Sequence, residues 1–112
     1  MGCLFCKIAK GEIPSHKVYE DEFVIAINDI APQAPVHVLI IPKEHIMSSA
    51  REAKDDNSVI IAHIFVVAAR IAQNLGLDSG YRMVTNVGED AGQTVNPLHF
   101  HLLGGKTLGP NA

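Results

Sequence analysis

The feature that most restricts the fold of this chain is one long amphipathic helical segment among shorter β-type segments. Asp55-Asp56-Asn57-Ser58 combines acidic residues with a capping side chain, as at a helix start, and Leu75-Gly76 is typical of a helix end. We therefore predict a helix over 57–75. Its apolar residues recur at helical spacing in two adjacent stripes, which are Ile60, Ile64, Val67, Ile71 and Ile61, Phe65, Ala68, Ala72. Together the stripes are wider than packing on one sheet requires, which predicts a second burial surface, most simply a subunit interface.

Five short segments rich in β-branched and aromatic residues account for much of the remaining chain. They cover 18–20, 23–28, 36–41, 81–86 and 98–103, and Asp21-Glu22 is the turn of a hairpin between the first two. Residues 5–11 are predicted to form a short helical turn that ends at Gly11. With 112 residues, the chain is expected to be a single domain over 1–112. Five strands and one long helix indicate an α+β fold.

Composition and charge exclude several classes of function. The hydrophobic share of 47% and the charged share of 19% are those of a globular protein. The net charge of −3 argues against nucleic acid as the main partner, because proteins that bind it usually carry a basic stripe. We expect no membrane span, since the chain has no apolar run of about 18 residues. The N-terminus lacks the pattern of a secretory signal, so the expected compartment is the cytoplasm.

Cys3 and Cys6 form a Cys-x-x-Cys pair near the start of the chain. In an intracellular protein, such a pair indicates half of a zinc site or a redox dithiol more often than a structural disulfide. Thioredoxin-like use is disfavoured, because the thioredoxin motif follows a strand and opens a helix, whereas Cys3 and Cys6 lie near the start of this sequence. Zinc ligation and a pair of free thiols both stay open at this point.

The pattern with most chemical content is His99-Phe100-His101, in an apolar run that ends at Gly104-Gly105. Two histidines at i and i+2 share one face of a β-strand, while Leu98, Phe100 and Leu102 point the other way. An unprotonated imidazole can attack phosphorus, and a second imidazole can stabilise charge or serve a leaving group. The alternative is a strand with two surface or core histidines.

Two further histidines stand in apolar segments. His37 interrupts the strand predicted over 36–41, where an imidazole without a hydrogen-bond partner would cost on the order of 1–3 kcal/mol. His63 lies on the predicted helix and is interpreted as a helix-surface or interface histidine, not as a ligand. The loop 87–94 is rich in glycine and acidic residues, which suits backbone N–H groups that face an anion.

The sequence around these histidines resembles the histidine-triad (HIT) superfamily. Gly92-Gln93-Thr94-Val95 corresponds to the lead-in of that family's motif, and His99, His101 and Gly104-Gly105 match its later positions, whereas Pro97 replaces the first triad histidine. Segments along nearly the whole chain resemble the purine nucleoside phosphoramidase branch; they are Phe5-Cys6-Lys7-Ile8, Glu12-Ile13-Pro14, residues 29–35, His37, residues 41–46 and residues 80–84. The resemblance implies a five-stranded antiparallel sheet, one long helix, a short N-terminal helix and a homodimer.

The resemblance also assigns roles to individual residues. His99 matches the nucleophile that attacks the α-phosphorus of a nucleotide, and His101 matches its partner at a phosphate oxygen or the leaving group. The other matching catalytic residues are His37 and Thr94. Thr94 and the amides around Gly92 and Gln93 match the groups that bind the phosphate. Asp29 matches the carboxylate that binds the ribose hydroxyls, although a turn residue is the alternative. The matching residues around ribose, base and phosphate are Asn28, Ile30, Ile27, Phe5, Ile8, Leu39 and Asn86.

Pro97 changes what the family pattern implies. In the phosphoramidase branch, the carbonyl at this position orients the nucleophilic ring, and proline keeps a carbonyl. Branches that begin with Cys-x-x-Cys resemble zinc sites built from those cysteines, the histidine at position 45 and the first triad histidine. Cys3, Cys6 and His45 are present, but Pro97 cannot coordinate, so structural zinc is possible with three ligands. No metal is required for the covalent step.

The favoured hypothesis is a hydrolase of purine nucleoside phosphoramidates or aminoacyl-adenylates that works through a nucleotidyl-His99 intermediate. Its expected ligand is a purine nucleotide such as AMP or GMP. The alternative is a low-activity nucleotide-binding or regulatory module, because Pro97 removes one imidazole. Dinucleoside polyphosphate hydrolysis is disfavoured, because that HIT branch usually has glutamine where this chain has His101.

Overall fold

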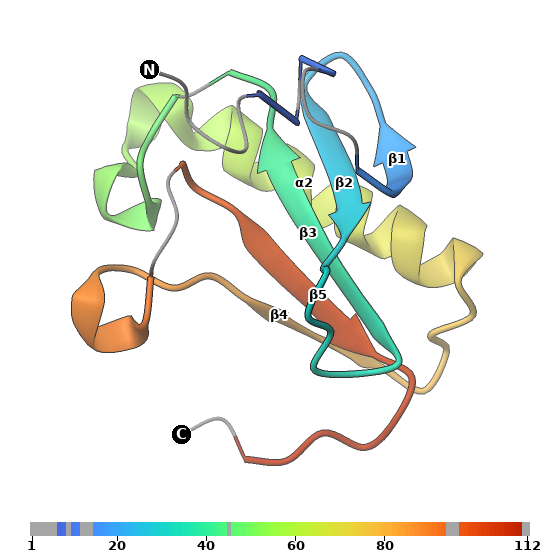
Figure 1. The fold of residues 1–112 in the computed structure, drawn as a ribbon. Helices are drawn as coiled ribbons and strands as arrows, with labels where there is room; N and C mark the ends of the chain where they lie inside the picture. Colours follow the sequence, from blue (N-terminus) through green and yellow to red (C-terminus); the bar gives the residue numbers. More distant parts are fainter. Residues whose placement is uncertain (1–6, 9, 12–14, 45, 94–96, 111–112) are drawn as a thin grey trace.

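Five strands form one antiparallel sheet in the order β1-β2-β3-β5-β4 (Figure 1). The computed structural model describes residues 7–8, 10–11, 15–44, 46–93 and 97–110. The strands are β1 (Lys17–Glu20), β2 (Val24–Asn28), β3 (Val36–Pro42), β4 (Tyr81–Val84) and β5 (Phe100–Gly104). The α+β fold with a five-stranded antiparallel sheet, predicted from the sequence, is confirmed.

The long helix α2 (Ser58–Asn74) crosses one face of the sheet (Figure 1). It ends as predicted, because Gly76 has a φ of 73° and Leu77 N–H donates to Ala72 O at 2.9 Å, which satisfies a carbonyl of the last turn. Its start differs from the prediction. Residues 55–57 form the short 3₁₀ helix η2 (Asp55–Asn57), and the Asn57 side chain accepts from Lys54 N–H at 2.9 Å instead of capping α2.

The main core lies between α2 and the sheet. The first predicted helix stripe is buried, together with Ala68 and Ala72 of the second stripe. Phe65, also of the second stripe, keeps 51% exposure and stacks edge to face on Phe100 at 5.6 Å between ring centroids. Leu98, Phe100 and Leu102 all belong to this core, so the predicted alternation of the His99 segment is confirmed.

A second apolar cluster lies on the sheet face opposite α2. It consists of Ile8, Ile25, Ile27, Leu39 and Ile41. Strand residues that pair directly point to the same face, and Leu39 pairs with His101 while His37 pairs with Leu103. The two histidines therefore lie beside the second cluster, on the face that α2 leaves uncovered.

Two predicted strands are shorter than the sequence pattern suggested. β4 ends at Val84 instead of residue 86, and β5 begins at Phe100 instead of residue 98. Thr85 uses its side-chain hydroxyl to donate to His99 O at 2.7 Å, and Leu98 N–H donates to Met47 O at 3.0 Å. Because His99 O and Leu98 N–H are bonded outside the ladder, regular pairing does not extend to these positions.

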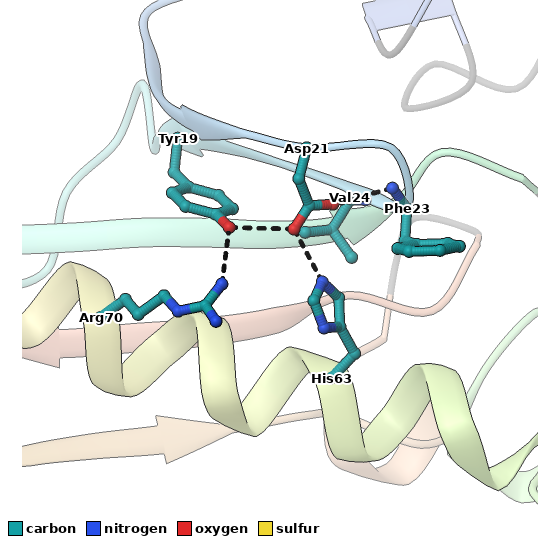
Figure 2. A network of polar contacts seen from close by, with 6 residues as sticks. All are labelled: Tyr19, Asp21, Phe23, Val24, His63 and Arg70. Carbon is teal, nitrogen blue, oxygen red and sulfur yellow. Dashed lines mark hydrogen bonds and ion pairs between the residues drawn. The ribbon is translucent and has the colours of Figure 1, made fainter.

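A polar network attaches the β1–β2 turn to α2 (Figure 2). Asp21 Oδ1 accepts from the N–H groups of Phe23 and Val24, and its Oδ2 accepts from Tyr19 OH at 2.9 Å and His63 Nε2 at 2.7 Å. Arg70 donates to Tyr19 OH at 3.1 Å. Burial raises the pKa of Asp21, but the hydrogen bonds from His63, Phe23, Val24 and Tyr19 outweigh it and lower the pKa to about 2.

Other predicted segments are described in part. Lys7 and Ile8 are helical, and Gly11 N–H donates to Ile8 O at 3.0 Å, in the region of the predicted N-terminal helical turn. Phe5 lies outside the described residues. Within the part of the chain that the structure covers, no helix combines the length and the apolar character needed to cross a membrane.

Candidate active site

Four ionisable side chains from separate segments meet on the open face of the sheet. His37 Nε2 lies 2.8 Å from His101 Nδ1 and 3.4 Å from Asp29 Oδ2. The rings of His101 and His99 pack edge to face with centroids 5.2 Å apart. Four of the predicted site residues, Asp29, His37, His99 and His101, are therefore brought together by the β3–β5 pairing and by the turn that follows β2.

The turn after β2 holds Asp29 and His37 in place. Asp29 N–H donates to His37 O at 2.9 Å, and Asp29 Oδ1 accepts from Ala31 N–H at 2.8 Å. Further along the same turn, Gln33 N–H donates to His37 Nδ1 at 3.0 Å. The requirement that His37 find hydrogen-bond partners is met, because both of its ring nitrogens are engaged.

Pro97 contacts the proposed nucleophile through its carbonyl group. His99 Nδ1 lies 3.1 Å from Pro97 O. Because a carbonyl oxygen only accepts, Nδ1 carries the ring proton and the lone pair of the neutral ring lies on Nε2. The orienting contact expected for the first triad position is thus present, although the residue is a proline.

Burial keeps the paired histidines in their neutral form. It lowers the pKa of His37, against the Asp29 carboxylate, which raises it. Burial is also the main reason that the pKa of His101 falls to about 4, with the neighbouring His99 and His37 lowering it further and Asp29 opposing them. Near neutral pH, His37 and His101 are therefore uncharged hydrogen-bonding groups.

The loop between β4 and β5 contains the residues predicted to cradle a phosphate. Asn86 Nδ2 donates to Ala91 O at 2.8 Å, so its side chain braces the loop. Gln93 Oε1 accepts from Gly88 N–H at 3.0 Å, and Gln93 Nε2 donates to Ser48 O at 2.9 Å. Gly92 is exposed with a φ of 81°. Thr94 lies outside the described residues.

The residues predicted to surround ribose and base have different environments. Ile8, Ile27 and Leu39 are buried together in the second apolar cluster. Asn28 is exposed at the end of β2, and Ile30 is fully exposed at 101%. Of these predicted binding residues, three are therefore part of the protein's apolar packing and two are exposed to solvent.

Two sets of residues have side chains of the kind that bind metal ions. Asp29, His37 and His101 offer ligand atoms that all lie within 4.8 Å of one another, although the sequence did not indicate them as metal ligands. Cys3, Cys6 and His45, which the family pattern suggested for zinc, lie outside the described residues.

Sequence reasoning missed two contributors to the site. Gln33 acts through its main-chain N–H, which every residue except proline possesses, so no sequence signal marks it. Thr85 braces the chain at His99 through its hydroxyl. A threonine just after a strand carries no distinctive pattern.

Comparison with known proteins agrees with the fold. The HIT domain family pattern matches residues 10–108. Purine nucleoside phosphoramidase from Escherichia coli K12 is 42% identical over 108 residues, which cover 96% of this chain and 90% of that protein. A HIT family hydrolase from Clostridium thermocellum is 55% identical, with a TM-score of 0.93 and coverage of 98% of this chain and 96% of the other. A histidine triad nucleotide-binding protein from Candida albicans is 37% identical, with a TM-score of 0.81 and coverage of 99% and 84%.

Together, the sheet topology, the paired histidines and these matches define the class. The chain belongs to the HIT domain family, and its solved neighbours include HIT family hydrolases.

Proposed function

We propose that this protein hydrolyses purine nucleoside phosphoramidates or aminoacyl-adenylates through a covalent nucleotidyl-His99 intermediate. The observation that carries this proposal is the contact between His99 Nδ1 and Pro97 O, which directs the imidazole lone pair to Nε2. The name of the Escherichia coli relative, purine nucleoside phosphoramidase, supports the choice of substrate class.

In the first step with a phosphoramidate, His99 Nε2 forms a bond to the α-phosphorus while the bond from phosphorus to the leaving amine nitrogen breaks; with an aminoacyl-adenylate, the bond to the carboxylate oxygen breaks and the carboxylate leaves with the electron pair. The amine nitrogen of the phosphoramidate keeps the electron pair and takes a proton from solvent. The imidazole ring becomes a cation, and the Pro97 carbonyl stabilises it by accepting from Nδ1–H. In the second step, water attacks phosphorus, the bond to Nε2 breaks, the nucleoside monophosphate leaves and a proton returns to solvent.

The remaining site residues are proposed to bind and orient the nucleotide, such as AMP or GMP. The Asp29 carboxylate would accept hydrogen bonds from the ribose hydroxyls, and the exposed Ile30 would pack on the ligand. The N–H groups of Gly92 and Gln93 donate to Glu89 O at 2.9 Å and to Gly88 O at 3.0 Å, so this turn would approach the phosphate without offering those two donors.

The test combines an adenosine phosphoramidate with the wild-type protein and the His99→Ala variant. We expect AMP as product and, after a quench in base that preserves phosphorus–nitrogen bonds, a nucleotidyl adduct on His99 by peptide mass spectrometry. His99→Ala should lose turnover but bind AMP within about tenfold of wild type, because the nucleophile acts mainly in the transition state.

The control for that experiment is His16→Ala, which removes an exposed imidazole outside the site and should turn over normally. Undiminished turnover by His99→Ala would refute the mechanism.

Pro97 supports a second candidate, a nucleotide-binding or regulatory module with little turnover. Proline has neither an imidazole nor a backbone N–H at the first triad position. Tight AMP binding without an adduct or product in the same assay would favour this candidate.

Three further properties are part of the proposal. The protein forms a homodimer through the helix over residues 57–75, whose exposed apolar side chains include Val59, Phe65 and Val66. Structural zinc binds Cys3, Cys6 and His45, and catalysis requires no metal. The compartment is the cytoplasm.

A further inference from the structure

Two consecutive hydrogen bonds connect the β2–β3 turn to His101, which lies beside the proposed nucleophile His99. Gln33 N–H donates to His37 Nδ1 at 3.0 Å, and His37 Nε2 lies 2.8 Å from His101 Nδ1. At its start the donor is certain, because a main-chain N–H can only donate. The Gln33 donor therefore determines which nitrogen donates in the next hydrogen bond, between His37 and His101.

The direction at His37 follows from the chemistry of a neutral imidazole, which has one N–H and one lone pair. Its Nδ1 uses the lone pair to accept from Gln33, so the ring proton is on Nε2. The Asp29 carboxylate, 3.4 Å from Nε2, favours the same arrangement because it only accepts. Protonation of both nitrogens would place an N–H of the ring against the N–H of Gln33.

The direction at His101 follows in turn. His37 Nε2–H is the donor in the 2.8 Å contact, so His101 Nδ1 accepts and the His101 proton lies on Nε2. The His37 lone pair is also directed at Gln33 and away from the cluster of Asp29, His37 and His101, which therefore lacks the ligand set that a divalent cation would need.

We propose that the main-chain N–H of Gln33 is a positioning group that fixes the tautomers of His37 and His101, so that His101 presents Nε2–H as a donor to the bound phosphate. This inference rests on the proposed function for its phosphate ligand. It assigns opposite tautomers to the two histidines of the motif: His99 is protonated on Nδ1 and has its lone pair on Nε2, whereas His101 is protonated on Nε2.

Opposite tautomers suit the two tasks. The nucleophile must offer a lone pair to phosphorus, and its neighbour must offer a hydrogen to the phosphate oxygens, whose negative charge it stabilises. If His37 had the other tautomer, His101 would donate to His37 and direct a lone pair at the phosphate. A lone pair on His101 Nε2 and a phosphate oxygen are both acceptors and repel each other. The turn over residues 31–35 therefore determines whether the contact between His101 and the phosphate is attractive or repulsive.

The first test reads the tautomers without substrate. Long-range ¹H–¹⁵N correlation spectra of uniformly labelled protein near neutral pH distinguish protonated ring nitrogens from those with a lone pair. We expect His37 and His101 to carry Nε2–H and His99 to carry Nδ1–H, assigned with single His→Gln variants. A His37 ring with Nδ1–H, or a doubly protonated His37, would overturn the inference.

The second test removes the single N–H. Replacing the Gln33 amide by an ester, with the α-hydroxy analogue of glutamine, deletes the donor and keeps the side chain. We expect part of the His37 population to shift to Nδ1–H, and kcat with an adenosine phosphoramidate to fall about tenfold or more while KM stays within about threefold. Gln33→Pro removes the same N–H in a purely genetic variant.

The matched variant is Gln33→Ala, which keeps the N–H and removes only the side chain that donates to Ala31 O. It should retain the wild-type tautomers, and any change in its rate measures the side chain alone. Retained wild-type tautomers and kcat in the ester variant would refute the role of Gln33. Failure of the wild-type protein to hydrolyse the phosphoramidate would refute the proposed function instead, and the spectra would still decide the tautomers.

Discussion

The network around Asp21 allows a quantitative prediction for Asp21→Asn. The carboxylate accepts four hydrogen bonds, two of them from side chains on the β1–β2 hairpin and on α2 (Figure 2). Asparagine keeps an oxygen for the N–H groups of Phe23 and Val24. It presents an amide N–H₂ group in place of the charged oxygen that accepts from Tyr19 and His63, so the contact between the hairpin and the helix is weakened.

The magnitude follows from the pKa of Asp21. A change from 3.8 to about 2 corresponds to roughly 2–3 kcal/mol of stability, at about 1.4 kcal/mol for each pKa unit. The side chain keeps 23% exposure, so solvent screening reduces this value, and we expect a loss of about 1–2 kcal/mol at pH 7.

The sign of the pH dependence is fixed by the direction of the shift. The folded protein holds the Asp21 pKa below the unfolded value, so the unfolded chain takes up the proton first as pH falls. The contribution of Asp21 is fully present above about pH 4 and is lost between about pH 4 and pH 2. The stability difference between wild type and Asp21→Asn should shrink over that window.

The assay is urea unfolding at one protein concentration, at pH 7 and at steps down to pH 2.5, with Asp78→Asn as control for an exposed carboxylate. In a double-mutant cycle with His63→Gln, the two losses should be less than additive. Equal midpoints for wild type and Asp21→Asn at pH 7, or a stability difference that stays constant down to pH 2.5, would refute this reasoning.

Two further predictions concern the proposed metal site and the proposed dimer. Pro97→His should raise zinc occupancy in reduced protein, measured by elemental analysis, and the accompanying gain in Tm should vanish with a chelator, because the imidazole completes a Cys₂His₂ set. Its catalytic rate should rise only modestly, and a large rise with no change in metal content would show that the missing imidazole serves the chemistry directly. Light scattering should find a dimer at micromolar concentration, and Phe65→Lys should shift the equilibrium toward monomer, because it places a charge on the apolar helix face. Wild-type protein that is monomeric at that concentration would contradict the dimer, and Ala62→Lys, at another exposed position on α2, tests the extent of the interface.

The sequence by itself determined the elements and the faces they present. Helical spacing identified α2, and Gly76 marked its end because only a residue that tolerates a positive φ completes that turn. The alternation of Leu98, Phe100 and Leu102 with His99 and His101 separated the core from the site. These features are local, since periodicity and backbone sterics act over a few residues.

The ends of the elements depended on contacts that no local pattern encodes. Asn57 was predicted as a capping residue, but its side chain serves the preceding 3₁₀ helix. β4 and β5 are shorter than predicted because Thr85 and Leu98 bond outside the ladder. In each case a tertiary or loop partner competed with the regular backbone pairing that the pattern alone would favour.

Only the tertiary structure decided which side chains of the site contact one another. His37 and His101 are 64 positions apart, and their contact exists because β3 pairs with β5 rather than with its sequence neighbour β4. Asp21 and His63, 42 positions apart, meet because α2 crosses the sheet beside the hairpin. The donor that sets the histidine tautomers is a main-chain N–H of Gln33, and since that group is common to nearly all residues, only its position in the folded turn gives it a role.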